Sequence, residues 1–382
     1  MPWRHDDASY AKYAIETLRY GRLDTHHFPV GYPLFVALCL KLSGGSFAAV
    51  RIANVVVGTL TIVMVSRVSS LLYGAAAGIA AAWFTALYPP LSFISSRVMS
   101  ETLFIGLLIP SVYLLIESEK STKVWYAVFG LGLFSVASLV RSNLLAMFAF
   151  LPLWLLTRRA VPIRRRLIIV SVGMALSGAI LLAPGLYFLK TKGEFIPLAT
   201  NAGQTFYGAN NPLADGGWVQ VEDHQELLST IPPSVRRSPQ AYSKAQNRLA
   251  VAWIRENPKA FLALLPKKFA NAWLPGFQKS QTTSDSRLVA ALLAMTFGML
   301  LIAAVIGRIK VKPAYGDGTL VAILFTYTAL SLVFYGNPRI GLYCAPVLII
   351  YASSILPLIM RFKFVSSLFE GSKKKGEQFF GT

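Results

Sequence analysis

Acidic side chains are scarce in this sequence, and so is charge in general. Only 14% of the 382 residues are charged, and 17 Asp and Glu stand against 37 Lys and Arg, for a net charge of +20. A soluble domain carries roughly 25% charged residues. With 54% hydrophobic residues and a mean hydropathy of +0.53, the composition excludes an ordinary soluble protein and indicates an integral membrane protein.

Cysteine is also rare, and no hydrophobic leader opens the sequence. Cys39 and Cys344 lie about three hundred residues apart in apolar surroundings, which favours small buried side chains over a disulfide. Residues 1–7 contain no hydrophobic region, so a cleavable signal peptide is not expected. The Lys and Arg residues cluster between apolar segments, as the positive-inside rule of membrane proteins describes, and no nucleic-acid partner is predicted.

Long apolar runs are what the sequence has in abundance. Stretches near or above the ~20 residues that cross a bilayer recur, which favours a helical bundle over a β-barrel. The predicted fold is therefore an all-α integral membrane protein, a polytopic bundle of about nine spans with an extracytoplasmic loop region. The spans are expected at 50–72, 75–96, 102–117, 124–140, 143–157, 167–189, 288–307, 318–335 and 340–360. The short pair at 124–157 could form a tilted or re-entrant hairpin, so the count could change by about two.

The spans divide the chain into five regions. These are an outer first loop at 1–45 with an amphipathic helix near 8–20, helices at 46–189, an outer cap at 190–285, helices at 286–361 and a basic cytosolic tail at 362–382. Residues 32–42 are apolar but too short to span, which predicts an interfacial segment.

The distribution of Lys and Arg sets the orientation. Basic residues gather in alternate connections, which places those connections in the cytosol. They are Arg67, Lys120, Lys123, Arg158, Arg159, Arg164, Arg165, Arg166, Arg308, Lys310, Lys312, Arg361, Lys363, Lys373, Lys374 and Lys375. The opposite, outer face then holds the N-terminus, the turn at 97–101, the 190–285 segment and the turn at 337–339.

The 190–285 segment is the one substantial region expected outside the membrane. Its first part is rich in turn residues, and residues 239–273 have the pattern of a helix, with Trp253 and Trp273 suited to the membrane interface. The turn residues are Gly208, Asn210, Asn211, Gly216 and Gly217. About ninety residues without a nucleotide fingerprint predict a cap over a site at the membrane surface, rather than an independent catalytic domain.

Glu101 is the most isolated acidic residue. The only other acids within residues 28–193 are Glu117 and Glu119, which lie in a polar turn with lysines. Glu101 stands where one apolar stretch ends and the next begins. An ionised carboxylate beside the membrane core costs several kcal/mol unless it has a function or a partner. Catalysis is one interpretation, and a structural ion pair with Arg97, four residues earlier, is the other.

Asp6 and Asp7 form the second isolated acidic feature. They suit a general base or a ligand of a divalent cation (Mg, Mn or Zn), since hard cations bind carboxylate oxygens, and Asp6 could share that cation with Glu101. The alternative is an N-cap pair for the helix at 8–20. The predicted topology brings Asp6, Asp7 and Glu101 to one face of the membrane, where they form a candidate catalytic site.

Arg339 begins the last span on the same outer face. A guanidinium there suits a phosphate, which it can bind with two parallel hydrogen bonds, and Arg97 is a second candidate phosphate ligand. The alternative for Arg339 is snorkelling to lipid headgroups. The histidines near the acids, which are His5, His26 and His27, match no recognised spacing of zinc ligands and are not predicted to bind metal.

A series of short motifs runs in order along almost the whole chain. They are Asp6-Asp7-Ala8-Ser9-Tyr10, Pro29-Val30-Gly31-Tyr32-Pro33-Leu34, Arg51-Ile52-Ala53-Asn54, Ser100-Glu101-Thr102-Leu103-Phe104, Gly208-Ala209-Asn210-Asn211-Pro212, Trp253-Ile254-Arg255-Glu256-Asn257-Pro258 and Pro338-Arg339. This succession resembles the GT-C glycosyltransferases, in particular the bacterial family-39-like enzymes related to protein O-mannosyltransferases and aminoarabinose lipid A transferases. Each motif is weak, whereas their ordered succession is fairly specific.

The resemblance implies a bacterial inner (plasma) membrane enzyme with its site facing the periplasm or exterior. Its partners would be a polyprenyl-phosphate sugar donor, membrane lipids and an acceptor glycan, lipid or protein, and the sugar would be transferred with inversion. Asp6 and Asp7 correspond to the acidic pair of the first outer loop, with Asp6 as base or metal ligand. Glu101 corresponds to the second acidic loop, and Arg339 to the basic position that holds the lipid phosphate.

Two departures from the family accompany the resemblance. Members usually have a transmembrane helix just before the acidic pair, and the sequence shows none before Asp6, as if that first helix were missing. Aminoarabinose transferases have a lysine before the matching proline, whereas His27-Phe28 precedes Pro29 here, which disfavours that substrate.

Two other function classes fit a charged polytopic protein. A flippase or other transporter of lipid-linked sugars would place its charges near the midplane, on broken helices in repeated halves, and the sequence shows no internal repeat. A polysaccharide polymerase or ligase of similar topology would use a pyrophosphate lipid as the leaving group.

Overall fold

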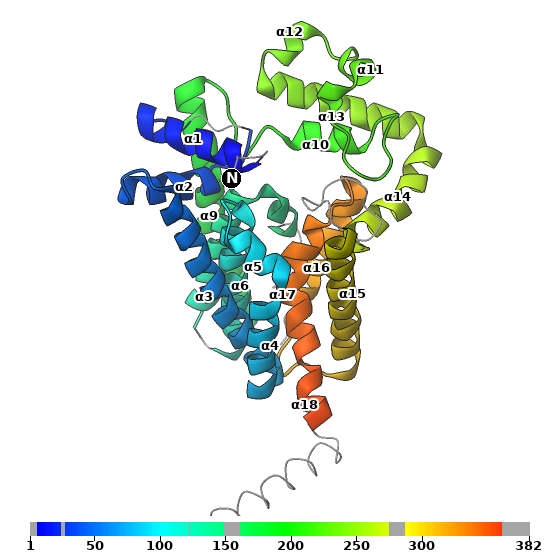
Figure 1. Cartoon of the computed structure of the whole chain (residues 1–382). Coiled ribbons are helices and arrows are strands. Elements are labelled where there is room, and N and C mark those ends of the chain that lie inside the picture. The colour runs from blue at the N-terminus through cyan, green and yellow to red at the C-terminus, as the bar shows by residue number, and fades with distance from the viewer. Residues whose placement is uncertain (1–5, 24–26, 122, 149–160, 275–286, 361–382) are drawn as a thin grey trace, which may run out of the picture.

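The chain is a bundle of membrane helices with an extramembrane cap at one end (Figure 1). The computed structural model describes residues 6–23, 27–121, 123–148, 161–274 and 287–360. Within these ranges the regular structure is helical throughout, as the sequence predicted. Cys39 and Cys344 are free cysteines, and Cys344 is buried, so the expectation of unbridged apolar thiols is confirmed.

Five helices are long and apolar enough to cross a membrane within the described residues. They are α3 (Phe47–Tyr73), α6 (Ser100–Lys120), α9 (Ile163–Lys192), the Ala291–Lys310 part of α15 (Arg287–Lys310) and the stretch Arg339–Ile359, which comprises α17 (Arg339–Ser353) and most of α18 (Ile355–Met360). The apolar windows of α6 and α17 are 61% and 67% buried by protein, against 17% for α15. Helices α6 and α17 therefore form the centre of the bundle, and α15 faces mainly lipid.

The predicted span at 75–96 is a bent pair of helices. Helices α4 (Ala75–Leu87) and α5 (Pro89–Ser95) meet at 61°. Pro89 and Pro90 open α5, and proline lacks the N–H of the helical ladder and clashes with the preceding turn, so a straight helix cannot continue through them. The described residues contain a sixth span only if α4 and α5 together are counted as a single span.

Three apolar helices are shorter than a full span. Helix α2 (Gly31–Leu42) matches the predicted interfacial segment, and α7 (Trp125–Val140) and α16 (Gly318–Val333) match predicted spans. The expected span at 143–157 begins as a 3-10 helix, η1 (Ser142–Ala146), and residues 149–157 lie outside the described residues. Within the described residues, the number of helices long enough to span is thus lower than the predicted nine.

The outer end of the bundle carries α1 (Asp6–Tyr20) and the cap (Figure 1). The cap consists of α10 (Ala202–Ala209), η2 (Val221–Asp223), α11 (Gln225–Leu228), α12 (Pro233–Arg236), α13 (Pro239–Glu256) and α14 (Pro258–Trp273). It has a small core of its own, formed by Tyr207, Val221, Leu227 and Ala250. The first part of the cap was expected to be turns, and it contains short helices joined by turns.

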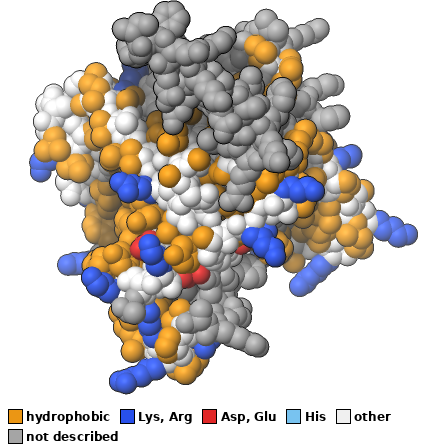
Figure 2. All heavy atoms as spheres, turned by 90° about the horizontal axis from the view of Figure 1, so that it is seen from below, with side chains coloured by type: hydrophobic (Ala, Val, Ile, Leu, Met, Phe, Trp, Pro, Cys, Tyr) orange, Lys and Arg blue, Asp and Glu red, His pale blue; other side chains and the backbone are white. Residues whose placement is uncertain are grey.

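The opposite end is the basic one. Lys120 lies in the last turn of α6, Arg308 and Lys310 lie in the last turn of α15, and Arg164–Arg166 lie in the first turn of α9. Figure 2 looks onto this end, where lysine and arginine side chains surround apolar surface and few acidic side chains are in view. This arrangement agrees with the uneven distribution of Lys and Arg that the positive-inside rule describes.

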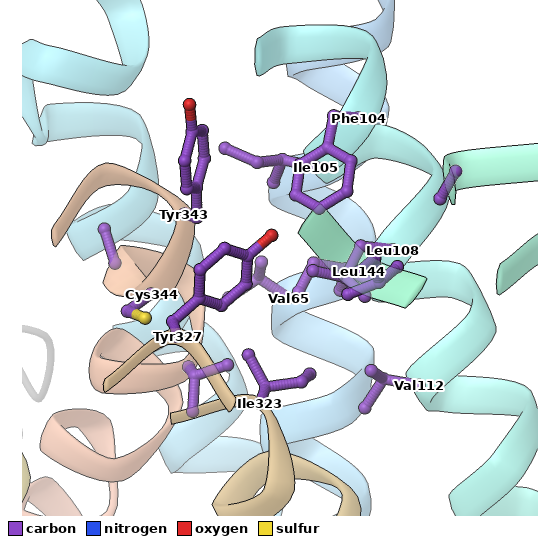
Figure 3. Close-up of a cluster of buried hydrophobic side chains, with 14 of the residues drawn as sticks. Val65, Phe104, Ile105, Leu108, Val112, Leu144, Ile323, Tyr327, Tyr343 and Cys344 are labelled. Carbon is purple, nitrogen blue, oxygen red and sulfur yellow. The ribbon is translucent and has the colours of Figure 1, made fainter. Parts of the chain in front are cut away.

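The core lies directly beneath the outer end of α6 and α17. Phe104 and Leu108 of α6 meet Tyr327 of α16 and Tyr343 of α17 around this centre (Figure 3). The rings of Phe104 and Tyr343 are 5.7 Å apart, and those of Tyr327 and Tyr343 are 5.3 Å apart. Because these aromatic side chains are rigid and fully packed, they fix the position of the first turn of α6 relative to the first turn of α17.

Close contact between α15 and α17 provides a test of this packing. A Cβ atom at Gly307 would overlap the Tyr351 carbonyl oxygen, whereas one at Gly298 on the same helix would meet nothing within 4 Å. We expect Gly307→Ala to destabilise the protein by about 1–3 kcal/mol through overpacking. Gly298→Ala gains the same helix propensity without the clash and leaves stability equal or slightly higher. Thermal unfolding in detergent measures both, and equal shifts for the two variants would contradict the packing described.

Candidate functional site

Acidic and basic side chains from four helices meet at the outer end of the bundle. The site is built on Glu101, which is the second residue of α6 and is only 1% exposed. Its Oε1 atom lies 3.2 Å from Nη1 of Arg141 and 3.7 Å from Nη1 of Arg339. A carboxylate in the first turn of a helix is also favoured by the helix dipole. Two guanidinium groups and a helix terminus thus compensate one buried negative charge.

Arg339 joins two carboxylates. It is the first residue of α17, and its Nη1 atom donates a 2.7 Å hydrogen bond to Oδ2 of Asp6 while lying within ion-pair distance of Glu101. The side chains of Arg339 and Asp6 are 38% and 27% exposed, so this pair forms the solvent-facing part of the site. Asp6 and Glu101 therefore lie on the same face of the bundle, as the topology required.

Arg141 forms the deeper part of the site. It follows α7 in an extended conformation, and its side chain is 17% exposed. Its Nη1 donates a 2.7 Å hydrogen bond to Ser100 Oγ, and its guanidinium lies 4.8 Å from the centre of the Tyr343 ring. Sequence reasoning did not select Arg141. The signal was present, because the predicted alternation of spans puts residue 141 on the outer face, where arginine is disfavoured without a specific reason.

A hydrogen-bond chain holds α1 against this group. The Tyr10 hydroxyl is 3.1 Å from Ser100 Oγ, and the Tyr10 ring packs 4.8 Å from the ring of Tyr32. The Tyr32 hydroxyl accepts a 2.9 Å hydrogen bond from Asn54, which also donates to the Arg97 carbonyl at 2.6 Å. These contacts connect α1, α2, α3 and the turn before α6, so they position the first turn of α1.

Asp7 differs from its neighbour Asp6 in its surroundings. Among the described residues it makes no ion pair within 4 Å. Burial raises its pKa above the ordinary value, and the charges of Asp6 and Glu101 raise it further, while Arg97 opposes them. Both acids lie in the first turn of α1, where the helix dipole favours negative charge, so they belong to the helix and do not precede it as the N-cap pair that the sequence offered as the alternative.

Arg97 does not form the ion pair with Glu101 that its spacing in the sequence allowed. It lies in the turn between α5 and α6, and its guanidinium stacks over the Phe93 ring at 4.4 Å. It makes no ion pair with Glu101, because Met99 is extended and α6 begins only at Ser100, so the i, i+4 spacing of a helix does not apply. Its charge acts on Asp7 instead.

The guanidinium of Arg339 lies within ion-pair distance of both carboxylates to which the sequence assigned a shared divalent cation. The Nη1 atom of Arg339 lies between Asp6 and Glu101 and already supplies positive charge to both. Within the described residues no group of three or more His, Cys, Asp or Glu is placed to hold a metal ion. His5 and His26 lie outside the described residues. A cation at this point would have to displace the guanidinium.

Comparison with known proteins bears on the fold. No protein-family model and no curated protein matches the sequence. The structure is similar to the archaeal oligosaccharyltransferase AglB from Archaeoglobus fulgidus, solved with an inhibitory peptide and a dolichol-phosphate, with a TM-score of 0.53 and 12% identity over 96% of this chain. The chain corresponds to 48% of the length of AglB. ArnT from Cupriavidus metallidurans in the apo state matches with a TM-score of 0.35 and 14% identity, over 92% of this chain and 73% of ArnT.

The likeness to AglB shows a shared fold, and at 12% identity it shows the fold alone. The chain is a polytopic membrane protein with a GT-C-like helical fold, which confirms the fold class expected from the sequence.

The pairing of Glu101 predicts how the site responds to mutation. Arg141→Met leaves the buried carboxylate with only the half-exposed Arg339, and we expect a loss of about 3 kcal/mol in unfolding free energy. Arg97→Met is the matched control, since it removes an arginine of the same rim that makes no ion pair with Glu101. Denaturation in detergent measures both. Adding Glu101→Gln to Arg141→Met should recover most of the loss; no recovery, or equal effects of the two arginine variants, would refute the pairing.

Proposed function

We propose that this protein is a membrane glycosyltransferase that moves a sugar from a polyprenyl-phosphate donor to an acceptor hydroxyl on the extracytoplasmic face, with inversion. The observation that carries the proposal is the meeting of Asp6, Asp7, Glu101 and Arg339 at the outer rim, on the same side as the cap. Two further features support it, namely the ordered GT-C-like motifs in the sequence and a fold shared with an enzyme whose structure contains dolichol-phosphate.

Arg339 is the group that binds the donor phosphate. Its side chain is partly exposed and points to the outer rim, where the head of a membrane lipid lies. A guanidinium binds phosphate oxygens with two charge-assisted hydrogen bonds, which are stronger than those to a single carboxylate oxygen. On donor binding Arg339 exchanges Asp6 Oδ2 for phosphate oxygens. Arg141, held deeper by Glu101, adds positive potential without moving.

Asp7 is the general base. The sequence favoured Asp6 for this role. Burial raises the pKa of Asp7, which makes its carboxylate a stronger base than that of an ordinary aspartate. Arg97 is assigned to the control of Asp7, in place of the phosphate-binding role expected from the sequence.

The reaction is a single displacement at the anomeric carbon. The acceptor oxygen forms a bond to that carbon as its proton passes to Asp7, and the bond between the carbon and the phosphate oxygen breaks. The lipid phosphate leaves with the electron pair, and Arg339 stabilises the charge that grows on it. The acceptor, which is a glycan, a lipid or a protein, enters from the side of the cap. The inverted product follows from attack opposite the leaving group.

The membrane location follows from the same geometry. Phosphate and sugar lie at the outer rim, and the polyprenyl chain extends into the hydrocarbon layer beside the bundle. The cap covers the sugar from outside. A bacterial inner membrane, with the site open to the periplasm or exterior, provides both the lipid donor and the acceptors.

Donor turnover tests the proposal. The purified chain in lipid nanodiscs is incubated with a panel of polyprenyl-phosphate hexoses and pentoses and an envelope extract as acceptor, and released polyprenyl phosphate is measured by mass spectrometry. Loss of a general base costs roughly 10²–10⁴-fold in rate, so we expect that decrease for Asp7→Asn. Glu16→Gln, on the same helix and in an exposed pair with Lys12, is the control. Full activity of Asp7→Asn, or no release by the wild type from any donor, would defeat the assignment.

The raised pKa of Asp7 predicts the acid side of the pH profile. A protonated carboxyl cannot accept the proton of the acceptor, so the rate falls as the pH drops through the pKa of Asp7. Because this pKa is raised, the fall occurs at a higher pH than for an ordinary aspartate, whose pKa is about 4. Arg97→Met removes the charge that lowers this pKa, so the fall should begin at still higher pH. Steady-state rates of the wild type and of Arg97→Met, measured at about ten pH values between pH 4 and pH 8, give the pH at which the rate falls. An unshifted acid limb would rule out control of Asp7 by Arg97.

Two further measurements distinguish the competing functions. The bent pair α4 and α5 is a broken helix of the kind that transporters use. It ends at Ser95, just before the turn that contains Arg97. Movement of a lipid-linked sugar across vesicles without release of polyprenyl phosphate would favour a flippase. Turnover of pyrophosphate lipids alone would favour a polymerase or ligase.

A further inference from the structure

Lys268 is a fully buried cation in the cap that the proposed reaction does not use. It lies on α14 and is 0% exposed. Among the described residues it has no carboxylate partner. Its Nζ atom donates instead to Asn210 Oδ1 at 2.7 Å and to the carbonyl oxygens of Leu332 at 3.3 Å and Val333 at 3.5 Å. Burial lowers its pKa to about 8. An ammonium group buried at such cost calls for a specific explanation.

The acceptors of Lys268 belong to one end of α16. Leu332 and Val333 are the last residues of that helix, where carbonyl groups lack helical partners and the dipole is negative. Asn210, which is also fully buried, donates to the same Val333 carbonyl at 3.1 Å and to Phe206 O at 2.9 Å. Lys268 and Asn210 thus join α14 and the end of α10 to the C-terminus of α16.

The turn that follows α16 leads directly to Arg339. Its central residue, Gly336, donates from its N–H to the Gly216 carbonyl at 3.0 Å. A Cβ atom at Gly336 would overlap the carbonyl oxygen of Lys268, so the turn lies against the backbone of α14 at this residue. Asn337 Oδ1 accepts a 2.9 Å hydrogen bond from the Arg339 N–H and fixes the start of α17. The turn is therefore held by α14 and by the cap loop at Gly216, which itself lies against α14.

We propose that Lys268, together with Asn210, is a positioning residue that sets the turn at 334–338 and thereby directs Arg339 toward Asp6 and Glu101. The cap and the phosphate-binding arginine then act as one mechanical unit, so that binding of lipid phosphate depends on how the cap is seated. This inference rests on the proposed function for the role of Arg339. The position of the turn itself does not depend on which reaction the protein catalyses.

The first experiment reads the turn without any ligand. Hydrogen exchange of the whole protein in nanodiscs is followed in the peptide covering 334–341, for Lys268→Met and for Lys267→Met. Lys267 is the adjacent, exposed lysine of the same helix and serves as the matched control. We expect exchange in this peptide to become about tenfold faster in Lys268→Met and to stay unchanged in Lys267→Met. If the 334–341 peptide exchanges at the wild-type rate in Lys268→Met, the proposal is overturned, whichever reaction the protein catalyses.

The second experiment reads the coupling to Arg339. Binding of polyprenyl phosphate, with neutral polyprenol as the reference lipid, is measured in the wild-type and the Arg339→Met backgrounds. Lys268→Met should weaken binding about tenfold in the first background and add less than about twofold in the second, because it acts through Arg339. Equal effects in both backgrounds would assign Lys268 a general structural role and refute positioning.

The outcomes separate the two proposals. If the wild type binds polyprenyl phosphate no better than polyprenol while the 334–341 peptide responds to Lys268→Met, the proposed function fails and the positioning stands. If Lys268→Met does not fold, Asn210→Ala, which keeps the ammonium and removes its shortest hydrogen bond, is carried through both experiments. The same changes in exchange and binding are then expected, and their absence overturns the proposal in the same way.

Discussion

The structure depends on the compensation of one buried negative charge. Glu101 stands almost wholly buried at the end of a central membrane helix, where an unpaired carboxylate is very costly. Arg141 from α7 and Arg339 from α17 supply the positive charge, so the ends of three helices distant in sequence must meet at one rim. Asp6 then pairs with the outer side of Arg339 and brings α1 over the site. The same contacts leave Arg339 partly exposed at the rim, where the donor phosphate of the proposed reaction would bind.

Much of this arrangement was accessible from the sequence. A lone acid between apolar runs, an acidic pair before an amphipathic helix and an arginine opening the last span are local signals, and the positive-inside rule assigns all three to one face. Such reasoning works because charge in a membrane protein is expensive and therefore placed with few alternatives. It also predicted an all-helical membrane fold, which the structure and the likeness to AglB confirm.

The features that sequence reasoning missed are set by tertiary contacts. Arg141 is on the outer face by the predicted alternation of spans, but only the packing of α7 beside α6 shows that it pairs with Glu101. Arg97 had the right spacing for an ion pair, but the helix starts three residues later, at Ser100. The sequence predicts one span at 75–96 because the residues on both sides of Pro89 are apolar, whereas the structure bends there. Lys268 gave no signal in the sequence, since its partners are the distant side chain of Asn210 and the backbone carbonyls of a helix end.

The cap and the bundle are connected through one turn. The turn at 334–338 touches α14 and the Gly216 loop on the cap side and carries Arg339 on the membrane side. A lipid phosphate at Arg339 and an acceptor beneath the cap would thus be sensed through the same few residues.

The most direct test of the central claim is a structure of the protein in nanodiscs with bound polyprenyl phosphate. The account predicts the phosphate group at the outer rim, in contact with the Arg339 guanidinium, with Asp6 released from that guanidinium and the Glu101–Arg141 pair unchanged. A phosphate bound near the middle of the bundle, or at the rim with the Arg339–Asp6 pair intact, would contradict it.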